Sequence, residues 1–127
     1  FHNQEVQTFL QGVVDDLYSG RLDDELVYRK RIRRRLADYR KNVPPHAQAA
    51  KKADQIQREK GLPPRYERGG WISYLMTVNG PEPLEHRESR LDYDHYVQRQ
   101  IAPAVDGILH FRNLSLEAII RSQLTLF

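Results

Sequence analysis

Positive charge is concentrated in one stretch of this chain, and that concentration limits what the stretch can fold into. Between Arg29 and Arg68, here called the basic block, there are 14 Lys or Arg residues and 4 acids, whereas the remainder holds 6 basic and 13 acidic residues. Six of the seven residues from 29 to 35 are cationic and repel one another, so an extended segment there cannot be buried on both faces. A solvated helix face would accommodate the same charges, but the clustering favours a polyanionic partner such as nucleic acid.

The composition indicates a single domain with a modest core. A length of 127 residues suits one domain, and 39% hydrophobic residues suffice for a small core. The absence of cysteine excludes disulfides and thiolate metal sites. No apolar run is long enough to span a bilayer and no signal peptide is visible, so we expect a soluble, cytoplasmic chain without a membrane partner. Because it begins at Phe1 and contains one methionine, we expect a fragment of a longer protein.

Two helices are predicted in the first half of the chain. Apolar residues recur at helical spacing over residues 5–19, and Gly20 provides a stop. A second helix should begin near Pro45, where a proline in the first turn costs no hydrogen bond, and should end at Lys60 before Gly61. Its four alanines predict close packing against a neighbouring element.

Two further helices are predicted towards the end of the chain. Residues 92–109 have near-helical apolar spacing, and Pro103 inside this segment should kink the helix. A last short helix is expected over residues 114–121.

Extended structure is predicted in two places. Residues 26–32 should form a short extended segment, followed by one helical turn at 36–39. Residues 71–78 are aromatic and β-branched with apolar side chains on both faces, which predicts a covered strand, and residues 79–81 should turn the chain. The predicted fold class is therefore α+β, mostly α with a small β-sheet around residues 71–78.

The last five residues are uncharged, although 29% of the chain is charged. Leaving Leu124, Leu126 and Phe127 in water costs about 1.5–3 kcal/mol apiece relative to burial. With Gln123 they form the pattern Gln-Leu-x-Leu-Phe, which resembles the peptide by which bacterial replication proteins dock on the sliding clamp. In that family the Gln forms a hydrogen bond at the rim of the clamp's pocket, and the Leu and Phe side chains fill an apolar groove. The alternative is a final turn folded back on its own core.

Several stretches in a fixed order resemble the C-terminal thumb domain of family B DNA polymerases. They are Leu26-Val27, Leu36-x-Asp38-Tyr39, Pro45-His46 with its alanine-rich helix, Gly70-x-Ile72-Ser73-Tyr74, Tyr93-Asp94-x-Tyr96, Ala104-Val105 and Ile108-Leu109. With the terminal peptide, the chain looks most like a bacterial member. The resemblance implies a palm–thumb junction helix at residues 1–20, a thumb at 21–112, and a helix with a clamp-binding tail at 113–127.

A polymerase thumb grips primer–template duplex of any sequence, so the resemblance implies contacts to phosphates rather than to base edges. We expect about half of the candidate cations to face the duplex, because alternate residues of an extended segment point to opposite sides. The candidate cations are Arg29, Lys30, Arg31, Arg33, Arg34, Arg35, Arg40, Lys41, Lys51 and Lys52.

Other candidate DNA contacts have competing explanations. In Arg68-Gly69-Gly70, exposed amides could cradle a phosphate, or the glycines could form a plain turn before the strand. Ser73 and Tyr74 offer hydroxyl donors, although Tyr74 is equally suited to the core. His46 could contact a phosphate or cap its helix.

No catalytic site is expected within the chain. The resemblance places the Mg²⁺ and the catalytic aspartates in the palm, so we expect no cofactor here and no activity from the fragment alone. Asp92 and Asp94 are expected to cap or complement a helix start, and His86 and His95 lack the spaced partners of a metal site. The alternatives are a stand-alone nucleic-acid-binding adaptor with a clamp-binding tail, a domain that binds an acidic protein, and a small hydrolase.

Overall fold

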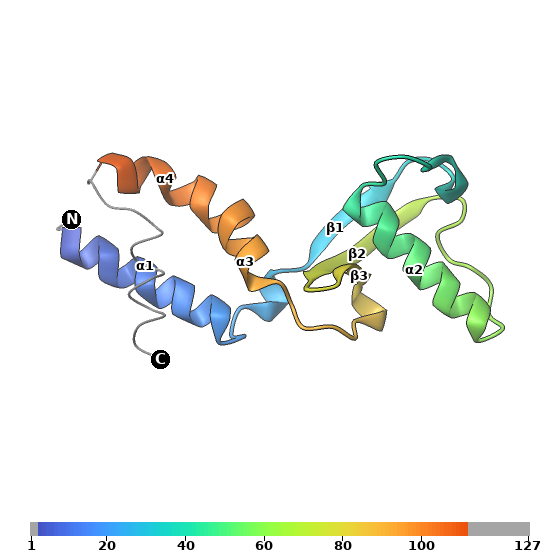
Figure 1. The fold of residues 1–127 in the computed structure, drawn as a ribbon, viewed down its shortest axis with the longest axis horizontal. Helices are drawn as coiled ribbons and strands as arrows, with labels where there is room; N and C mark the ends of the chain where they lie inside the picture. Colours follow the sequence, from blue (N-terminus) through green and yellow to red (C-terminus); the bar gives the residue numbers. More distant parts are fainter. Residues whose placement is uncertain (1–2, 112–127) are drawn as a thin grey trace. The chain divides into compact units, whose positions relative to one another are not determined.

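The structure, a computed structural model, describes residues 3–111 of the chain (Figure 1). The helix expected at 114–121 and the terminal peptide at 123–127 lie outside the described residues. The chain divides into two compact units, Phe1–Glu25 with Tyr93–Phe127, and Leu26–Asp92. We call the described part of the first the helical unit and the second the sheet unit.

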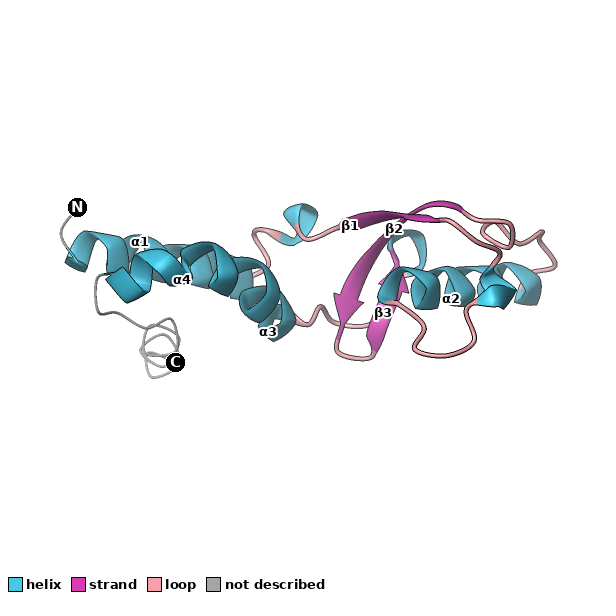
Figure 2. Cartoon of the chain, turned by 90° about the horizontal axis from the view of Figure 1, so that it is seen from above, coloured by secondary structure: helices cyan, strands magenta, loops and turns pink. Residues whose placement is uncertain are grey.

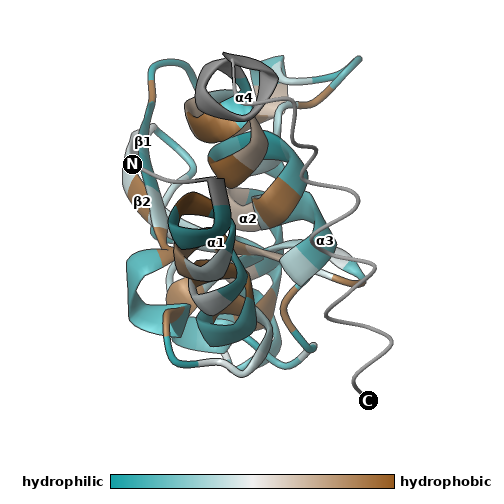
Figure 3. Cartoon of the chain, turned by 90° about the vertical axis from the view of Figure 1, so that its left-hand side faces the viewer, coloured by the Kyte–Doolittle hydropathy of each residue, from teal (hydrophilic) through white to brown (hydrophobic). Residues whose placement is uncertain are grey.

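The helical unit begins with α1, Asn3–Tyr18, close to the predicted bounds. Its buried stripe consists of Leu10, Val14 and Leu17, with exposed fractions of 5%, 0% and 1%. Apolar and polar residues alternate along the helix, as Figure 3 shows. Gly20 adopts a φ of +87°, a left-handed conformation that suits glycine and stops the helix as predicted.

The predicted helix at residues 92–109 is present, but its middle is wider than an α-helix. It consists of α3, Tyr93–Tyr96, a π-helical stretch, Val97–Ile101, and α4, Ala102–Phe111. The Ala102 amide reaches back five residues to the Val97 carbonyl. Pro103 has no N–H to continue the α-helical pattern, and the π-helical stretch lies just before it. The kink predicted at this proline stays a prediction.

Tyrosine hydroxyls connect the two segments of the helical unit. Tyr18 donates to Asp94 at 2.6 Å, and Tyr93 donates to Asp23 at 2.9 Å. The rings of Tyr18 and Tyr93 meet edge to face with centroids 6.1 Å apart. These contacts hold the end of α1 against the start of α3.

The sheet unit contains a three-stranded antiparallel sheet in the order β1-β2-β3 (Figure 2). Its strands are β1, Tyr28–Ile32, β2, Gly70–Thr77, and β3, Gly80–Pro83. The first two match the predicted extended segments. The third was missed, because residues 79–81 read as a turn and β3 contains Pro81 and Pro83. Proline is tolerated here because β3 is an edge strand. The α+β fold class is confirmed.

Helix α2, Pro45–Glu59, packs on one face of the sheet. Its buried positions include four alanines that are 0% exposed, so the helix backbone can approach the strands closely. These alanines are Ala47, Ala49, Ala50 and Ala53. The sheet contributes Ile32, Ile72 and Tyr74 to the same core. The helix ends as predicted at Gly61, which has a φ of +72° and donates to the Arg58 carbonyl, while the Leu62 amide donates to Gln57 at 2.8 Å.

Two buried carboxylates fasten loops of the sheet unit. Asp54, 1% exposed, accepts hydrogen bonds from the amides of Arg65 and Tyr66. Glu82, 7% exposed, accepts from the amides of residues 88 and 89 and from the hydroxyls of Thr77 and Ser89. Burial alone would raise the pKa of Glu82, but these hydrogen bonds lower it to about 2.

Candidate nucleic-acid interface

The pairing of β1 with β2 sorts the cations of β1 between two faces of the sheet. Directly opposite residues of an antiparallel pair share a face. Lys30 lies opposite Ile72, on the face that α2 covers. Arg29 lies opposite Ser73 and Arg31 opposite Trp71, on the other face. We call the four residues Arg29, Arg31, Trp71 and Ser73 the open face. Within β1, therefore, Arg29 and Arg31 share one face of the sheet and Lys30 lies on the other; that about half of the candidate cations face a duplex stays a prediction.

Trp71 is the aromatic residue of the open face. It is 55% exposed, and the guanidinium carbon of Arg29 lies 4.8 Å from its ring centroid. A cation–π contact of this kind contributes about 0.5–1 kcal/mol at an exposed site. The prediction that β2 is covered on both faces was wrong at this end. The alternation of Trp71 and Ser73 with buried Ile72 and Tyr74 was the sequence signal that separates the faces.

A second group of exposed cations follows β1. It includes Arg33, Arg34, Arg35, Arg40 and Lys41, all exposed. Between them, buried Leu36 and Tyr39 anchor the short 3₁₀ turn Leu36–Asp38 to the core, so the charges sit on a supported segment. We call these five cations the distal cluster.

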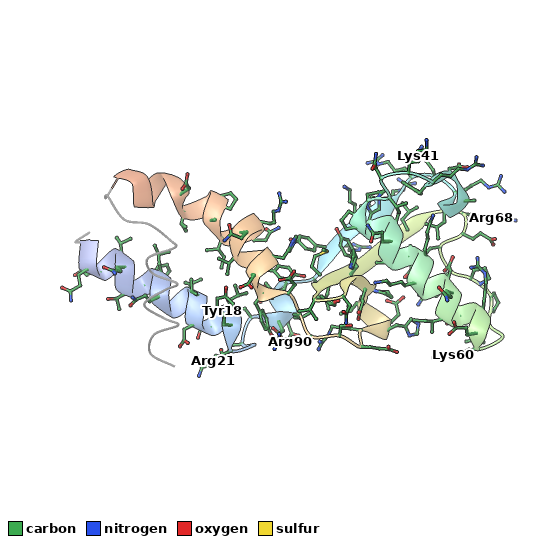
Figure 4. All side chains as sticks on the ribbon, in the orientation of Figure 1. Tyr18, Arg21, Lys41, Lys60, Arg68 and Arg90 are labelled. Carbon is green, nitrogen blue, oxygen red and sulfur yellow. The ribbon has the colours of Figure 1, made fainter. Side chains whose placement is uncertain are left out.

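No carboxylate of the described residues forms an ion pair with the distal cluster. Among residues 3–111, the ion pairs are Arg21 with Asp16 at 3.1 Å and Arg65 with Glu85 at 3.6 Å, and neither involves the cluster. Arg34 packs over the Tyr39 ring at 4.6 Å, which orients one member. In Figure 4, Lys41 and Arg68 extend from loops at the same end of the sheet unit, whereas Lys60 lies at the end of α2. This end of the unit can therefore attract a polyanion.

The two lysines of α2 have partners inside the sheet unit. Lys51 donates to the Tyr39 carbonyl at 2.6 Å, and Lys52 donates to the Pro81 carbonyl at 2.7 Å. Their ammonium groups therefore connect α2 to the 3₁₀ segment and to the β2–β3 hairpin. The position of each ammonium group is therefore set by an internal contact.

The geometry of Arg68-Gly69-Gly70 favours a turn over a phosphate cradle. The Gly69 amide donates to the Tyr66 carbonyl at 2.9 Å, so it is already used. Gly69 has a φ of +100°, and a Cβ there would meet the Ile32 carbonyl oxygen at 2.7 Å. Glycine is thus required for the chain to pass close to β1 as it enters β2. Arg68 itself is exposed.

Two predicted contact residues lie in the core of the sheet unit. Tyr74, 7% exposed, stacks on Tyr28 with centroids 5.3 Å apart, and its pKa is raised by burial and by Tyr28. His46, 6% exposed, meets Tyr39 edge to face at 6.1 Å. Burial and the nearby Lys30 charge lower the pKa of His46, and within the described part of the chain its Nδ1 has no hydrogen-bond partner. Both placements argue against direct contact with DNA.

Within 3–111, no group of three or more His, Asp or Glu side chains could hold a metal ion. Asp94, expected to cap or complement a helix start, accepts a hydrogen bond from the Tyr18 hydroxyl. In the same range, no helix combines the length and apolar character needed to cross a membrane.

Comparison with known proteins relates the whole chain to part of a longer protein. No protein-family model matches the chain. Over all 127 residues, the chain is 45% identical to DNA polymerase II of Escherichia coli (strain K12). The match spans 16% of that protein's length, so the chain corresponds to a small part of it. The resemblance to a bacterial DNA polymerase drawn from the sequence motifs is therefore confirmed, and the chain is similar along its whole length to a segment of DNA polymerase II.

Proposed function

We propose that this chain is the thumb of a bacterial family B DNA polymerase and that it grips primer–template duplex behind the active site. The observation that carries the proposal is the distal cluster, a supported group of exposed cations without carboxylate partners among the described residues. The similarity to DNA polymerase II supports DNA as the polyanion. Cations on a surface suit phosphates, which are the same in every sequence.

In this proposal the chain binds the duplex and does not itself catalyse nucleotide transfer. Nucleotide transfer and its Mg²⁺ belong to the palm in the remainder of the polymerase, and α1 joins palm and thumb. Neutralising phosphates releases counterions, so the grip weakens as salt rises. The terminal pattern Gln123-Leu124-x-Leu126-Phe127 docks on the sliding clamp, which keeps the enzyme at a high local concentration near DNA in the bacterial cytoplasm and nucleoid.

The grip is tested by fluorescence anisotropy with labelled duplexes of unrelated sequence. Replacing Arg33, Arg34 and Arg35 by Ala should weaken binding and reduce the slope of log K against log salt by about 0.9 for each phosphate that the variant no longer neutralises. A control with an equal reduction in charge replaces Arg58, Lys60 and Arg90, which are exposed outside the distal cluster. The control should retain the wild-type slope.

Two results would contradict the grip. Equally weakened binding in the variant and its control would show that net charge alone attracts DNA, without a defined surface. Affinities that differ strongly between duplex sequences would show base readout rather than phosphate contacts.

The clamp peptide is tested separately by surface plasmon resonance on an immobilised bacterial clamp. Replacing Leu126 and Phe127 by Ala should abolish binding, whereas Thr125→Ala, at the variable position of the pattern, should not. Circular dichroism should show the same fold for all variants. Loss of the fold in the double variant would place the tail in the core of the chain.

A further inference from the structure

The open face contains a feature that a duplex grip does not explain. Phosphates are bound by cations, hydroxyl groups and backbone amides, and the distal cluster already supplies cations. Trp71 is nevertheless 55% exposed beside two arginines. A partly exposed indole next to guanidinium groups offers aromatic surface for a stacking partner.

Whether a base can stack on such a ring depends on whether the nucleic acid is double-stranded or single-stranded. In a duplex, the bases stack on one another and present only their edges and the backbone to a protein. In a single strand, each base can offer a π face, and surfaces that combine cations with aromatic rings bind such strands through stacking. A tryptophan flanked by arginines matches the second case.

The charge on this face also favours a nucleic-acid strand. Arg31 lies directly opposite Trp71 in the sheet, and Arg29 lies directly opposite Ser73. Glu82 lies on the same face further along the sheet, where it is 7% exposed and bonded to Ser89. An approaching phosphate would therefore meet cations and a hydroxyl, with this acid withdrawn from the surface.

We propose that the open face is a binding site for unpaired nucleotides of a DNA strand. A base stacks on the exposed surface of Trp71, while Arg29 and Arg31 hold the adjoining phosphates and Ser73 donates a hydrogen bond. The contact of Arg29 with the ring holds the indole in place before the base arrives. The inference rests on the proposed function for nucleic acid as the partner. It assigns the strand to the open face and the duplex to the distal cluster.

Trp71 is the single tryptophan of the chain, so its fluorescence reports directly on this site. The 127-residue chain is titrated at low salt with oligothymidine of about eight nucleotides, which is within the site size of small single-strand-binding folds. Oligothymidine should quench the emission saturably. An abasic strand of equal length, which keeps the phosphates but lacks the bases, and a blunt duplex should leave it nearly unchanged.

Variants separate stacking from charge. By anisotropy, Trp71→Ala should weaken binding to the strand by about tenfold or more, and Trp71→Phe should restore most of the affinity. Val78→Ala, which removes an exposed apolar side chain just after β2, serves as the control and should bind normally. Duplex affinity should be the same for all of these proteins.

Three results would overturn the proposal. Equal quenching by the abasic strand would assign the response to phosphate alone, and equal quenching by an acidic peptide would indicate an acidic protein partner. An equal reduction of duplex and strand affinity in Trp71→Ala would place the ring in the duplex grip. The distal-cluster variant tests the duplex grip independently, so failure of one proposal is distinguishable from failure of the other.

Discussion

Replacing Glu82 by Gln should make the stability of the sheet unit much less dependent on pH. The carboxylate is 7% exposed and holds the segment after β3 through its bonds to the amides of residues 88 and 89. Glutamine has the same shape and keeps an acceptor for these amides, but it carries no charge and cannot titrate. The substitution therefore isolates the contribution of the ionised group.

The size of the effect follows from the pKa. Burial raises the pKa of Glu82, but hydrogen bonds from Ser89, Glu88 and Thr77 lower it from 4.5 to about 2. That difference corresponds to about 3 kcal/mol of stability, taken as an upper value. Because the folded-state pKa lies below the unfolded value, this stability is complete above pH 4.5 and is lost as the pH falls towards 2.

The measurement is urea unfolding followed by the fluorescence of Trp71, which lies in the same unit. At neutral pH, Glu82→Gln should lower the free energy of unfolding by about 1–3 kcal/mol. The difference from wild type should close as the pH falls from about 6 to about 2, because the wild-type carboxyl becomes neutral as well. Glu88→Gln, at an exposed side chain, is the matched control and should follow the wild type. A constant gap at every pH, or no gap at neutral pH, would refute the reasoning.

Three further substitutions test other parts of the sheet unit by thermal unfolding. Gly69→Ala should destabilise by more than about 1 kcal/mol, because its Cβ would meet the Ile32 carbonyl at 2.7 Å and its φ is +100°; an unchanged midpoint would exclude that close approach. Asp54→Ala should cost about 1–3 kcal/mol by leaving the buried Tyr66 amide unpaired, and a neutral result would mean that water replaces the carboxylate. Ala50→Leu should cost about 1–3 kcal/mol through overpacking between α2 and the sheet, whereas a stabilised variant would reveal spare volume.

Helix boundaries were predictable because their signals are local. Gly20 and Gly61 adopt left-handed conformations at the ends of α1 and α2, and Pro45 occupies the first turn of α2. Each signal acts through the backbone of its own residue and needs no distant contact. The edge strand β3 escaped prediction because its prolines are acceptable only where a neighbouring strand is missing on one side.

The candidate site was predicted in part. The exposed cations of the distal cluster follow from the density of charge, since so many like charges cannot be buried together. Tyr74 and His46 were candidates for DNA contact, and the structure places both in the core. Tyrosine and histidine occur both on protein surfaces and in protein interiors, so the residue type alone could not predict whether these two side chains are exposed or buried.

The sequence by itself determined that this chain has a cationic surface, α-helices ending at particular glycines, and a likeness to a DNA polymerase. These properties depend on composition, local conformation and residue order. Only the tertiary structure decided that Arg29, Arg31 and Trp71 share one face of the sheet while Lys30 lies on the other. The physical reason is register: pairing β1 with β2 joins residues about forty positions apart, and a slip of one position would exchange the two faces.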